Sequence, residues 1–100
     1  MLNKRKISII GGAGHVGYPL GLIFSSKGFQ VTLIDKDKKN SKKINSGISP
    51  FLEEGSESLL KKMLKKRCIL ATSDLQKVKE SKFIIICIGT PIDNSLNPEI

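Results

Sequence analysis

Residues 6–17 read KISIIGGAGHVG, a short and mostly apolar run followed by a glycine-rich segment. The apolar run predicts a buried strand that breaks into a turn. Gly12, Gly14 and Gly17 have the spacing GxGxxG, in which the first glycine permits a tight turn out of the strand. The second lets backbone amides approach an anion, and the third lets the following helix pack closely on the sheet. Because that helix presents unpaired N–H groups and a positive dipole end, the stretch predicts a phosphate-binding turn.

The segment after the glycine turn indicates a helix and a second strand. A helix over about residues 15–27, closed by Gly28, is predicted by apolar residues that recur at every third or fourth position: Val16, Leu20, Ile23 and Phe24. Residues 30–34 (QVTLI) are β-branched and apolar, which predicts a strand that ends at Asp35. This acid follows Gly14 by about 20 residues, so strand, glycine turn, helix and acid together match the fingerprint of a dinucleotide-binding fold.

Asp35 has a predicted role of its own. At the tip of the second strand its carboxylate can accept hydrogen bonds from ribose hydroxyls, and its charge would repel a 2′-phosphate. The sequence therefore predicts NAD rather than NADP as the coenzyme. Lys36, Lys38 and Lys39 act against this preference, because a lysine side chain can reach toward a phosphate. The alternative is that Asp35 serves only the turn.

The rest of the chain continues to alternate between helices and strands. Asp37 predicts the cap of a second helix, which Gly47 closes, and Ser56 predicts the cap of a third. Residues 68–72 (CILAT) predict a strand, and the spacing of Ser73 and Gln76 predicts the capping box of a brief helix. One further segment, residues 83–88 (FIIICI), is apolar throughout, as in a parallel strand covered on both faces.

This order of elements predicts an α/β fold. Strands that alternate with helices imply right-handed crossovers and a doubly wound parallel sheet of the Rossmann type, with strand order 3-2-1-4. Asn97 and Pro98 look like the start of a helix that has no body within the sequence. We therefore expect residues 1–100 to form the N-terminal part of a dinucleotide-binding domain, with the rest of the protein absent.

Composition and charge exclude several classes of protein. With 100 residues, 39% apolar and 26% charged, the chain fits one small folded domain. Its longest apolar run is far shorter than the roughly 20 residues of a membrane-spanning helix, and no signal peptide is evident, so we expect a cytoplasmic protein without membrane contact. Although the net charge is +8, there are four Phe, one Tyr and no Trp to stack on bases, and we predict no nucleic-acid partner. Cys68 and Cys87 lie in apolar runs and are expected to be buried, reduced thiols.

The exit from the last strand is a second candidate contact with a coenzyme. In a doubly wound sheet, ligands bind outside the carboxyl ends of the strands at the point where strand order reverses. The first and fourth strands flank that crevice. Gly89 would permit close approach of the coenzyme, the Thr90 hydroxyl would bond its ribose or phosphate, and Pro91 would fix the loop. The alternative is an ordinary exit from a strand into a loop.

Several further stretches resemble one family of enzymes. They are VGYPL at residues 16–20, IDKD at 34–37, INSG at 44–47, SPFLEEG at 49–55, ATSD at 71–74, ICIGTPID at 86–93 and LNP at 96–98. The ICIGTPID block is the most specific, since GTP after a fully apolar strand is not a general feature of dinucleotide folds. Over essentially its whole length the chain resembles the N-terminal domain of the nucleotide-sugar 6-dehydrogenases, which include the UDP-glucose, GDP-mannose and UDP-N-acetylmannosamine dehydrogenases.

The resemblance implies an NAD-dependent oxidoreductase. Such an enzyme oxidises the C6 alcohol of a UDP- or GDP-sugar to a uronic acid for surface polysaccharide synthesis, by two hydride transfers to NAD. The resemblance places the catalytic cysteine and its helpers beyond residue 100, so this chain alone is expected to be inactive and to hold no catalytic residue and no metal. It implies that NAD is bound by Gly12, Ala13, Gly14, His15, Val16, Gly17, Asp35, Ile88, Gly89, Thr90, Pro91 and Ile92.

Some positions depart from the family's pattern. Asn40 stands where a basic residue is usual, His15 where Tyr is common, and Ser41 where an apolar residue is usual. Glu53 occupies the position of a loop acid near the family's active site, and no role is assigned to it. The substrate is a nucleotide sugar whose identity stays open, although LNP slightly favours a UDP-N-acetylhexosamine. The full-length enzyme is expected to be a homo-oligomer assembled through the missing region.

Three other interpretations remain at this point. Gly11, Gly14 and Gly17 also spell GxxGxxG, the turn of the extended short-chain dehydrogenases, which include nucleotide-sugar epimerases. A non-catalytic, basic nucleotide-binding module would account for the positive charge and would bind DNA in a salt-dependent way. A gene that stops at residue 100 would leave a broken remnant of the enzyme.

Overall fold

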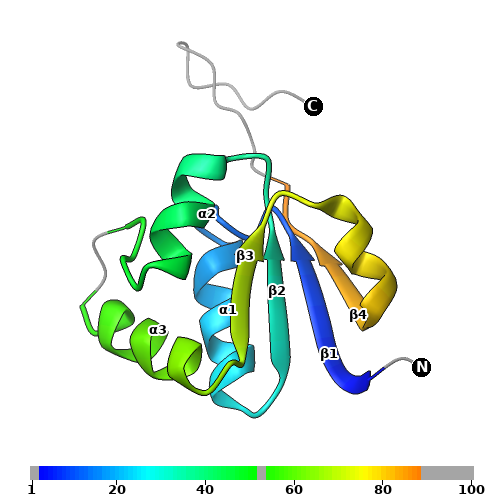
Figure 1. Cartoon of the computed structure of the whole chain (residues 1–100), viewed down its shortest axis with the longest axis horizontal. Helices are drawn as coiled ribbons and strands as arrows, with labels where there is room; N and C mark the ends of the chain where they lie inside the picture. The colour runs from blue at the N-terminus through cyan, green and yellow to red at the C-terminus, as the bar shows by residue number, and fades with distance from the viewer. Residues whose placement is uncertain (1–2, 52–53, 89–100) are drawn as a thin grey trace.

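The computed structural model describes residues 3–51 and 54–88 as four strands with helices between them (Figure 1). The strands are β1 (Asn3–Ile10), β2 (Gln30–Ile34), β3 (Ile69–Thr72) and β4 (Ser81–Ile86). They are joined by α1 (Gly17–Ser26), α2 (Lys38–Asn45), α3 (Ser56–Lys65) and the 3-10 helix η1 (Leu75–Glu80). All three strand pairs are parallel, and the order across the sheet is β3-β2-β1-β4, which confirms the predicted topology. The helix expected from Asn97 lies outside the described residues.

The hydrophobic core lies between the sheet and the three α-helices. Helix α1 contacts β2 and α3, and α2 contacts β3, whereas η1 contacts β1, β2 and β4. Alternate residues of β1, β2 and β3 point toward the helices, as the two-residue period of a strand requires. The buried cluster comprises Ile7, Ile9, Ala13, Tyr18, Leu22, Val31, Leu33, Ile44, Leu60, Met63, Ile69 and Ala71.

The buried face of α1 agrees only in part with the predicted one: Leu20 and Phe24 pack against the core, as predicted. Val16 and Ile23 are 68% and 54% exposed, whereas Tyr18 and Leu22 are buried. The reason is Gly21, where a Cβ atom would lie 2.5 Å from Leu33 Cδ2 on β2. The glycine side of the helix therefore lies against the sheet, and the apolar spacing alone indicated a stripe that is rotated away from it.

Two of the three predicted helix caps are wrong. Asp37 does cap α2, since its Oδ1 accepts the Asn40 N–H at 2.9 Å. At α3 the N-cap is Gly55, with φ +82°, and the Ser56 hydroxyl instead donates to Ser49 Oγ at 3.0 Å. At η1 the cap is Asp74 rather than Ser73. The Ser56 hydroxyl has a tertiary partner in Ser49, and spacing alone does not show that partner.

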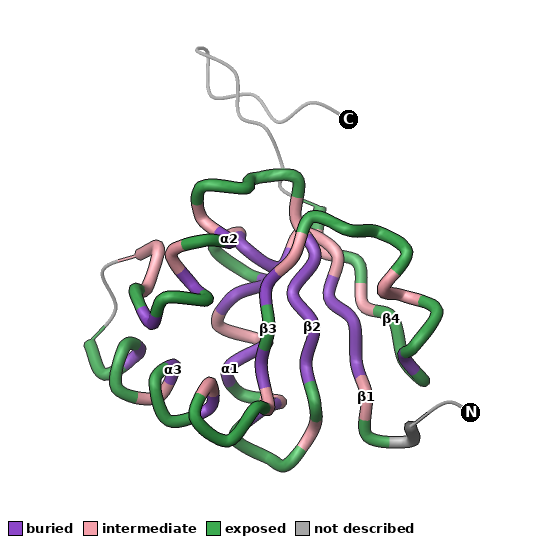
Figure 2. The backbone as a smooth tube through the Cα atoms, in the orientation of Figure 1, coloured by how far each residue is buried: buried purple, intermediate pink, exposed green. Residues whose placement is uncertain are grey.

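The prediction that β4 is covered on both faces is wrong. Phe83, Ile84 and Ile86 are 52%, 49% and 62% exposed. Figure 2 shows much of β4 in the colour of exposed residues. Among the described elements only β1 and η1 pack against β4 closely, so its outer edge and most of its two faces have no covering layer. Cys68 and Cys87 are free thiols, as predicted, but both are half-buried rather than buried.

The opposite edge of the sheet is protected by a side chain. Asn45, in the last turn of α2, donates from Nδ2 to the Ala71 carbonyl at 2.7 Å and accepts the Ala71 N–H on Oδ1 at 2.8 Å. This amide pairs with β3 as a neighbouring strand would, which blocks part of the exposed edge.

Within the described residues, none of the helices combines the length and hydrophobicity that a bilayer crossing needs.

Candidate functional site

The glycine turn is fastened to the carboxyl end of β2. The N–H groups of Gly11 and Gly12 both donate to the Ile34 carbonyl, at 2.8 and 3.1 Å. Gly11 has φ +81°, and a Cβ atom there would lie 2.1 Å from the Cys87 carbonyl oxygen, so Gly11 makes the turn out of β1. The prediction gave this role to Gly12. Gly12 is required for another reason, because its Cβ would lie 2.6 Å from Leu33 Cβ.

The third glycine of the motif packs on the turn itself. A Cβ atom at Gly17 would lie 2.3 Å from the Gly11 carbonyl oxygen and 2.9 Å from Gly12 Cα. The predicted close packing of helix on sheet is instead made by Gly21. Gly14 is the least crowded, with only the Gly11 oxygen 3.3 Å from a built Cβ, so its open side is available to a ligand.

Three consecutive backbone amides lie free at the start of α1. Among the described residues, no hydrogen bond satisfies the N–H groups of His15, Val16 and Gly17, whereas Gly14 N–H donates to Gly11 and Tyr18 N–H donates to Gly14. The first turn of α1 holds no acidic side chain that would compete for them. Free amides and the positive end of the helix dipole together bind an anion such as a diphosphate.

Asp35 follows β2 and already holds the glycine turn. Its Oδ2 accepts the Ala13 N–H at 3.0 Å, and its Oδ1 accepts the Asp37 N–H at 2.9 Å. Each carboxylate oxygen keeps a second lone pair for a ligand hydroxyl. Asp35 is half-buried and is among the residues that line one of the hollows at the turn. Its structural role in the turn was not foreseen, because no spacing rule links residues 13 and 35.

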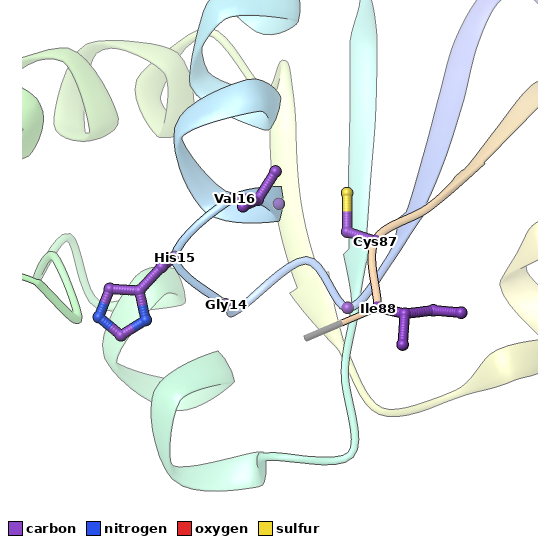
Figure 3. Close-up of a pocket in the computed structure, with 7 residues that line it drawn as sticks. Gly14, His15, Val16, Cys87 and Ile88 are labelled. Carbon is purple, nitrogen blue, oxygen red and sulfur yellow. The ribbon is translucent and has the colours of Figure 1, made fainter. Parts of the chain in front are cut away.

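Two hollows meet at the turn. The first, of about 390 Å³, is lined by Gly11, Gly14, His15, Val16, Gly17, Cys87 and Ile88 (Figure 3). The second, of about 490 Å³, is lined by Ile10, Gly11, Gly14, Ile34, Asp35, Lys36, Ser73, Leu75, Ile86, Cys87 and Ile88. They share Gly11, Gly14, Cys87 and Ile88 and are therefore adjacent, in the crevice where strand order reverses between β1 and β4. Each has the size of a small-molecule site.

The structure brings six of the twelve predicted site residues to these hollows. Gly14, His15, Val16, Gly17 and Ile88 line the first, and Asp35 lines the second. Gly12 and Ala13 lie buried beneath the turn, where they support it rather than face a ligand. Outside the described residues lie Glu53, Gly89, Thr90, Pro91 and Ile92.

Eight lining residues were not among the predicted coenzyme contacts: Ile10, Gly11, Ile34, Lys36, Ser73, Leu75, Ile86 and Cys87. Cys87 lines both hollows, although its place in an apolar run predicted a buried thiol. It lies beside the glycine turn because Ile86, the residue before it, pairs with Ile10 at the end of β1. Leu75, 55% exposed at the start of η1, lines the second hollow. The available signal was an apolar residue at the first position of a short, mostly polar helix.

The fold and this site define a class of protein: a parallel α/β domain that binds a dinucleotide at the carboxyl ends of its strands. Residues 5–100 match the family described as the UDP-glucose/GDP-mannose dehydrogenase family, NAD binding domain. The chain therefore belongs to that family, and the coenzyme of the domain is NAD. This match also favours the nucleotide-sugar dehydrogenase interpretation of the glycine turn over the extended short-chain dehydrogenases.

Curated relatives and solved structures agree with the assignment. The chain is 35% identical over 99 residues to the UDP-N-acetyl-D-glucosamine 6-dehydrogenase of Salmonella typhi, covering 99% of this chain and 22% of that protein. It is 32% identical over 87 residues to the UDP-N-acetyl-D-mannosamine dehydrogenase of Pyrococcus horikoshii, covering 87% of this chain and 21% of that protein. The crystal structure of a ternary complex of GDP-mannose dehydrogenase from Pseudomonas aeruginosa matches with a TM-score of 0.84 and 33% identity, over 93% of this chain and 21% of that one. The chain thus spans about a fifth of each of these proteins.

Proposed function

We propose that this chain binds NAD across the two hollows, as the coenzyme-binding part of a nucleotide-sugar 6-dehydrogenase. The observation that carries the proposal is the row of free amides at His15, Val16 and Gly17 beside the Asp35 carboxylate. The amides would hold the diphosphate, and the carboxylate would accept hydrogen bonds from the adenosine ribose. The apolar lining of the second hollow, which includes Leu75 and Ile86, suits the adenine ring.

The chemistry of the whole enzyme is the second part of the proposal. Two molecules of NAD, bound one after the other, would each accept one hydride as the C6 alcohol of a UDP- or GDP-sugar becomes a carboxylate. Water would supply the second carboxylate oxygen, and the product would be a uronic acid for surface polysaccharide synthesis. The names of the relatives support this reaction, and a UDP-N-acetylhexosamine is the first substrate to test. The described residues contain no group of three or more His, Cys, Asp or Glu that would bind a metal. We place the catalytic residues beyond residue 100, in a cytoplasmic homo-oligomer, so that residues 1–100 alone are inactive.

A titration of the folded chain with both coenzymes tests the first part. NAD is expected to bind more tightly than NADP, because the Asp35 carboxylate would repel a 2′-phosphate. Calorimetry that detects no binding of NAD, or that finds NADP to be the tighter ligand, would contradict the proposal. For the longer protein, two NADH per nucleotide sugar are expected, and one NADH would argue against formation of the acid.

A further inference from the structure

One aromatic side chain from a distant loop packs on the phosphate-binding turn. Phe51 stacks on the His15 imidazole, with ring centroids 3.8 Å apart and planes inclined by 27°. The same phenyl ring meets Tyr18 edge-on, with centroids 6.3 Å apart and an angle of 60°. His15 begins the segment whose amides are free and Tyr18 directly follows it, so Phe51 contacts a side chain at each end of the anion site.

Phe51 is held in place by hydrogen bonds that lead to α3. The Ser49 hydroxyl donates to the Phe51 carbonyl at 2.8 Å and accepts the Ser56 hydroxyl at 3.0 Å. The Ser49 N–H donates to Glu57 Oε1 at 3.1 Å. Because Ser56 and Glu57 belong to the first turn of α3, the loop that carries Phe51 is fastened to a helix that itself contacts α1.

The His15 ring therefore points away from the hollow that its backbone lines. Figure 3 shows the imidazole on the far side of the turn from Cys87 and Ile88. Its side chain packs on Phe51, whereas its N–H has no hydrogen-bond partner among the described residues. The stack thus fixes the backbone at residue 15 from behind, and the amide is left free for a ligand.

We propose that Phe51 is a positioning residue for coenzyme binding: by stacking on His15 it holds the amides of residues 15–17 in the orientation that binds the diphosphate. The inference rests on the proposed function, since it assigns Phe51 a part in the same site. Preorganised donors lose less conformational freedom on binding than mobile ones, so loss of the stack lowers the affinity for NAD without removing any atom that touches it.

The stack has a spectroscopic signature that does not depend on NAD. His15 is the only histidine in the chain, so its ring protons give the only histidine signals in a proton NMR spectrum. A phenyl ring face-on at this distance shifts those signals upfield. In Phe51→Leu the signals are expected to move to the positions of a free histidine, and unchanged positions would overturn the stack.

The affinity measurement tests the positioning role. In Phe51→Leu the Kd for NAD is expected to rise roughly three- to tenfold, the loss that corresponds to one aromatic pair. In a His15→Ala background the same substitution should change the Kd by less than twofold, because the stack is already absent. His15 is exposed, so His15→Ala should leave the fold intact.

A matched control separates positioning from general loss of stability. Phe29 meets Phe24 edge-on, with centroids 5.7 Å apart, at the other end of α1. Phe29→Leu is expected to lower the thermal midpoint as Phe51→Leu does, and to leave the Kd for NAD unchanged. If wild-type chain binds NAD and Phe51→Leu binds it equally well, this inference is wrong and the proposed function stands. If the wild type binds no NAD, the proposed function fails and the inference fails with it.

Discussion

Strands β1 and β4 lie side by side and have similar apolar sequences, yet they occupy different environments. In β1, Ile7 and Ile9 are buried between the sheet and the helices. In β4, Phe83 pairs with Ile7 and Ile85 pairs with Ile9, but Phe83 and Ile84 are half-exposed (Figure 2). An apolar run therefore indicates that a strand can be buried, whereas the elements around it determine whether it is.

The carboxyl ends of β1 and β4 differ in the hydrogen bonds that hold the segments after them. The turn after β1 is held by the Ile34 carbonyl and the Asp35 carboxylate. The segment after β4 is tied to β1 through the Cys87 N–H, which donates to the Ile10 carbonyl at 2.8 Å. The turn after β1 is thus held by β2 and Asp35, and Cys87, directly after β4, is held by β1.

The largest effect is expected on the free energy of unfolding, when a buried side chain of β1 and an exposed side chain of β4 are truncated. Ile9→Ala should lower the free energy of unfolding by about 3 kcal/mol, because it removes buried methylene groups and leaves a cavity. Ile84→Ala should lower it by less than about 1 kcal/mol, since that side chain already meets water. Urea denaturation of both variants measures the difference, and equal losses would mean that β4 is covered in solution.

Asp35→Asn tests how far the end of β1 depends on its carboxylate. An amide offers one oxygen, so one of the two N–H groups of Ala13 and Asp37 would lose its acceptor, at a cost of about 1–3 kcal/mol. The affinity for NAD should fall by at least about tenfold, because the turn and the ribose contact are both affected. Asp74→Asn is the control: that residue caps η1, asparagine caps equally well, and neither stability nor affinity should change.

The two thiols provide a comparison of the two ends of the sheet. Cys87 lines both hollows, whereas Cys68 precedes β3 at the opposite end and lines neither. In a Cys68→Ser variant, saturating NAD should slow alkylation of Cys87 several-fold by covering the cleft. In Cys87→Ser, NAD should leave the alkylation rate of Cys68 unchanged. Equal protection of both thiols would instead indicate a general change in stability.

The smallest expected effect concerns an ion pair between Lys6 on β1 and Glu80, which directly precedes β4. Lys6 Nζ donates to Glu80 Oε1 at 2.9 Å, and Lys77 Nζ lies 3.4 Å from Glu80 Oε2. These two lysines lower the pKa of the Glu80 carboxyl group, chiefly through the Lys6 hydrogen bond. A carboxyl group whose pKa is lowered in the folded state stabilises the fold above its unfolded pKa. Glu80→Gln should therefore slightly lower the thermal midpoint at neutral pH. The difference should disappear as the pH falls through the folded pKa, and a difference that persists in acid would exclude this ion pair as its cause.

Much of the fold could be predicted because its signals are local. The alternation of elements, the cap at Asp37 and the acid about 20 residues after Gly14 all follow from periodicity and spacing. The strand order 3-2-1-4 followed from the handedness of crossovers and is confirmed. The buried face of α1 was predicted wrongly because the packing of Gly21 on Leu33 joins residues from two elements.

The fold class, the family and the position of the phosphate-binding turn follow from the amino-acid sequence, since each depends on residue type at a fixed spacing along the chain. The folded chain was needed to show which glycine makes the turn, which strand stays exposed, and that Phe51 lies behind His15. Those features depend on contacts between segments far apart in sequence. Such contacts are set by packing, which no local pattern contains.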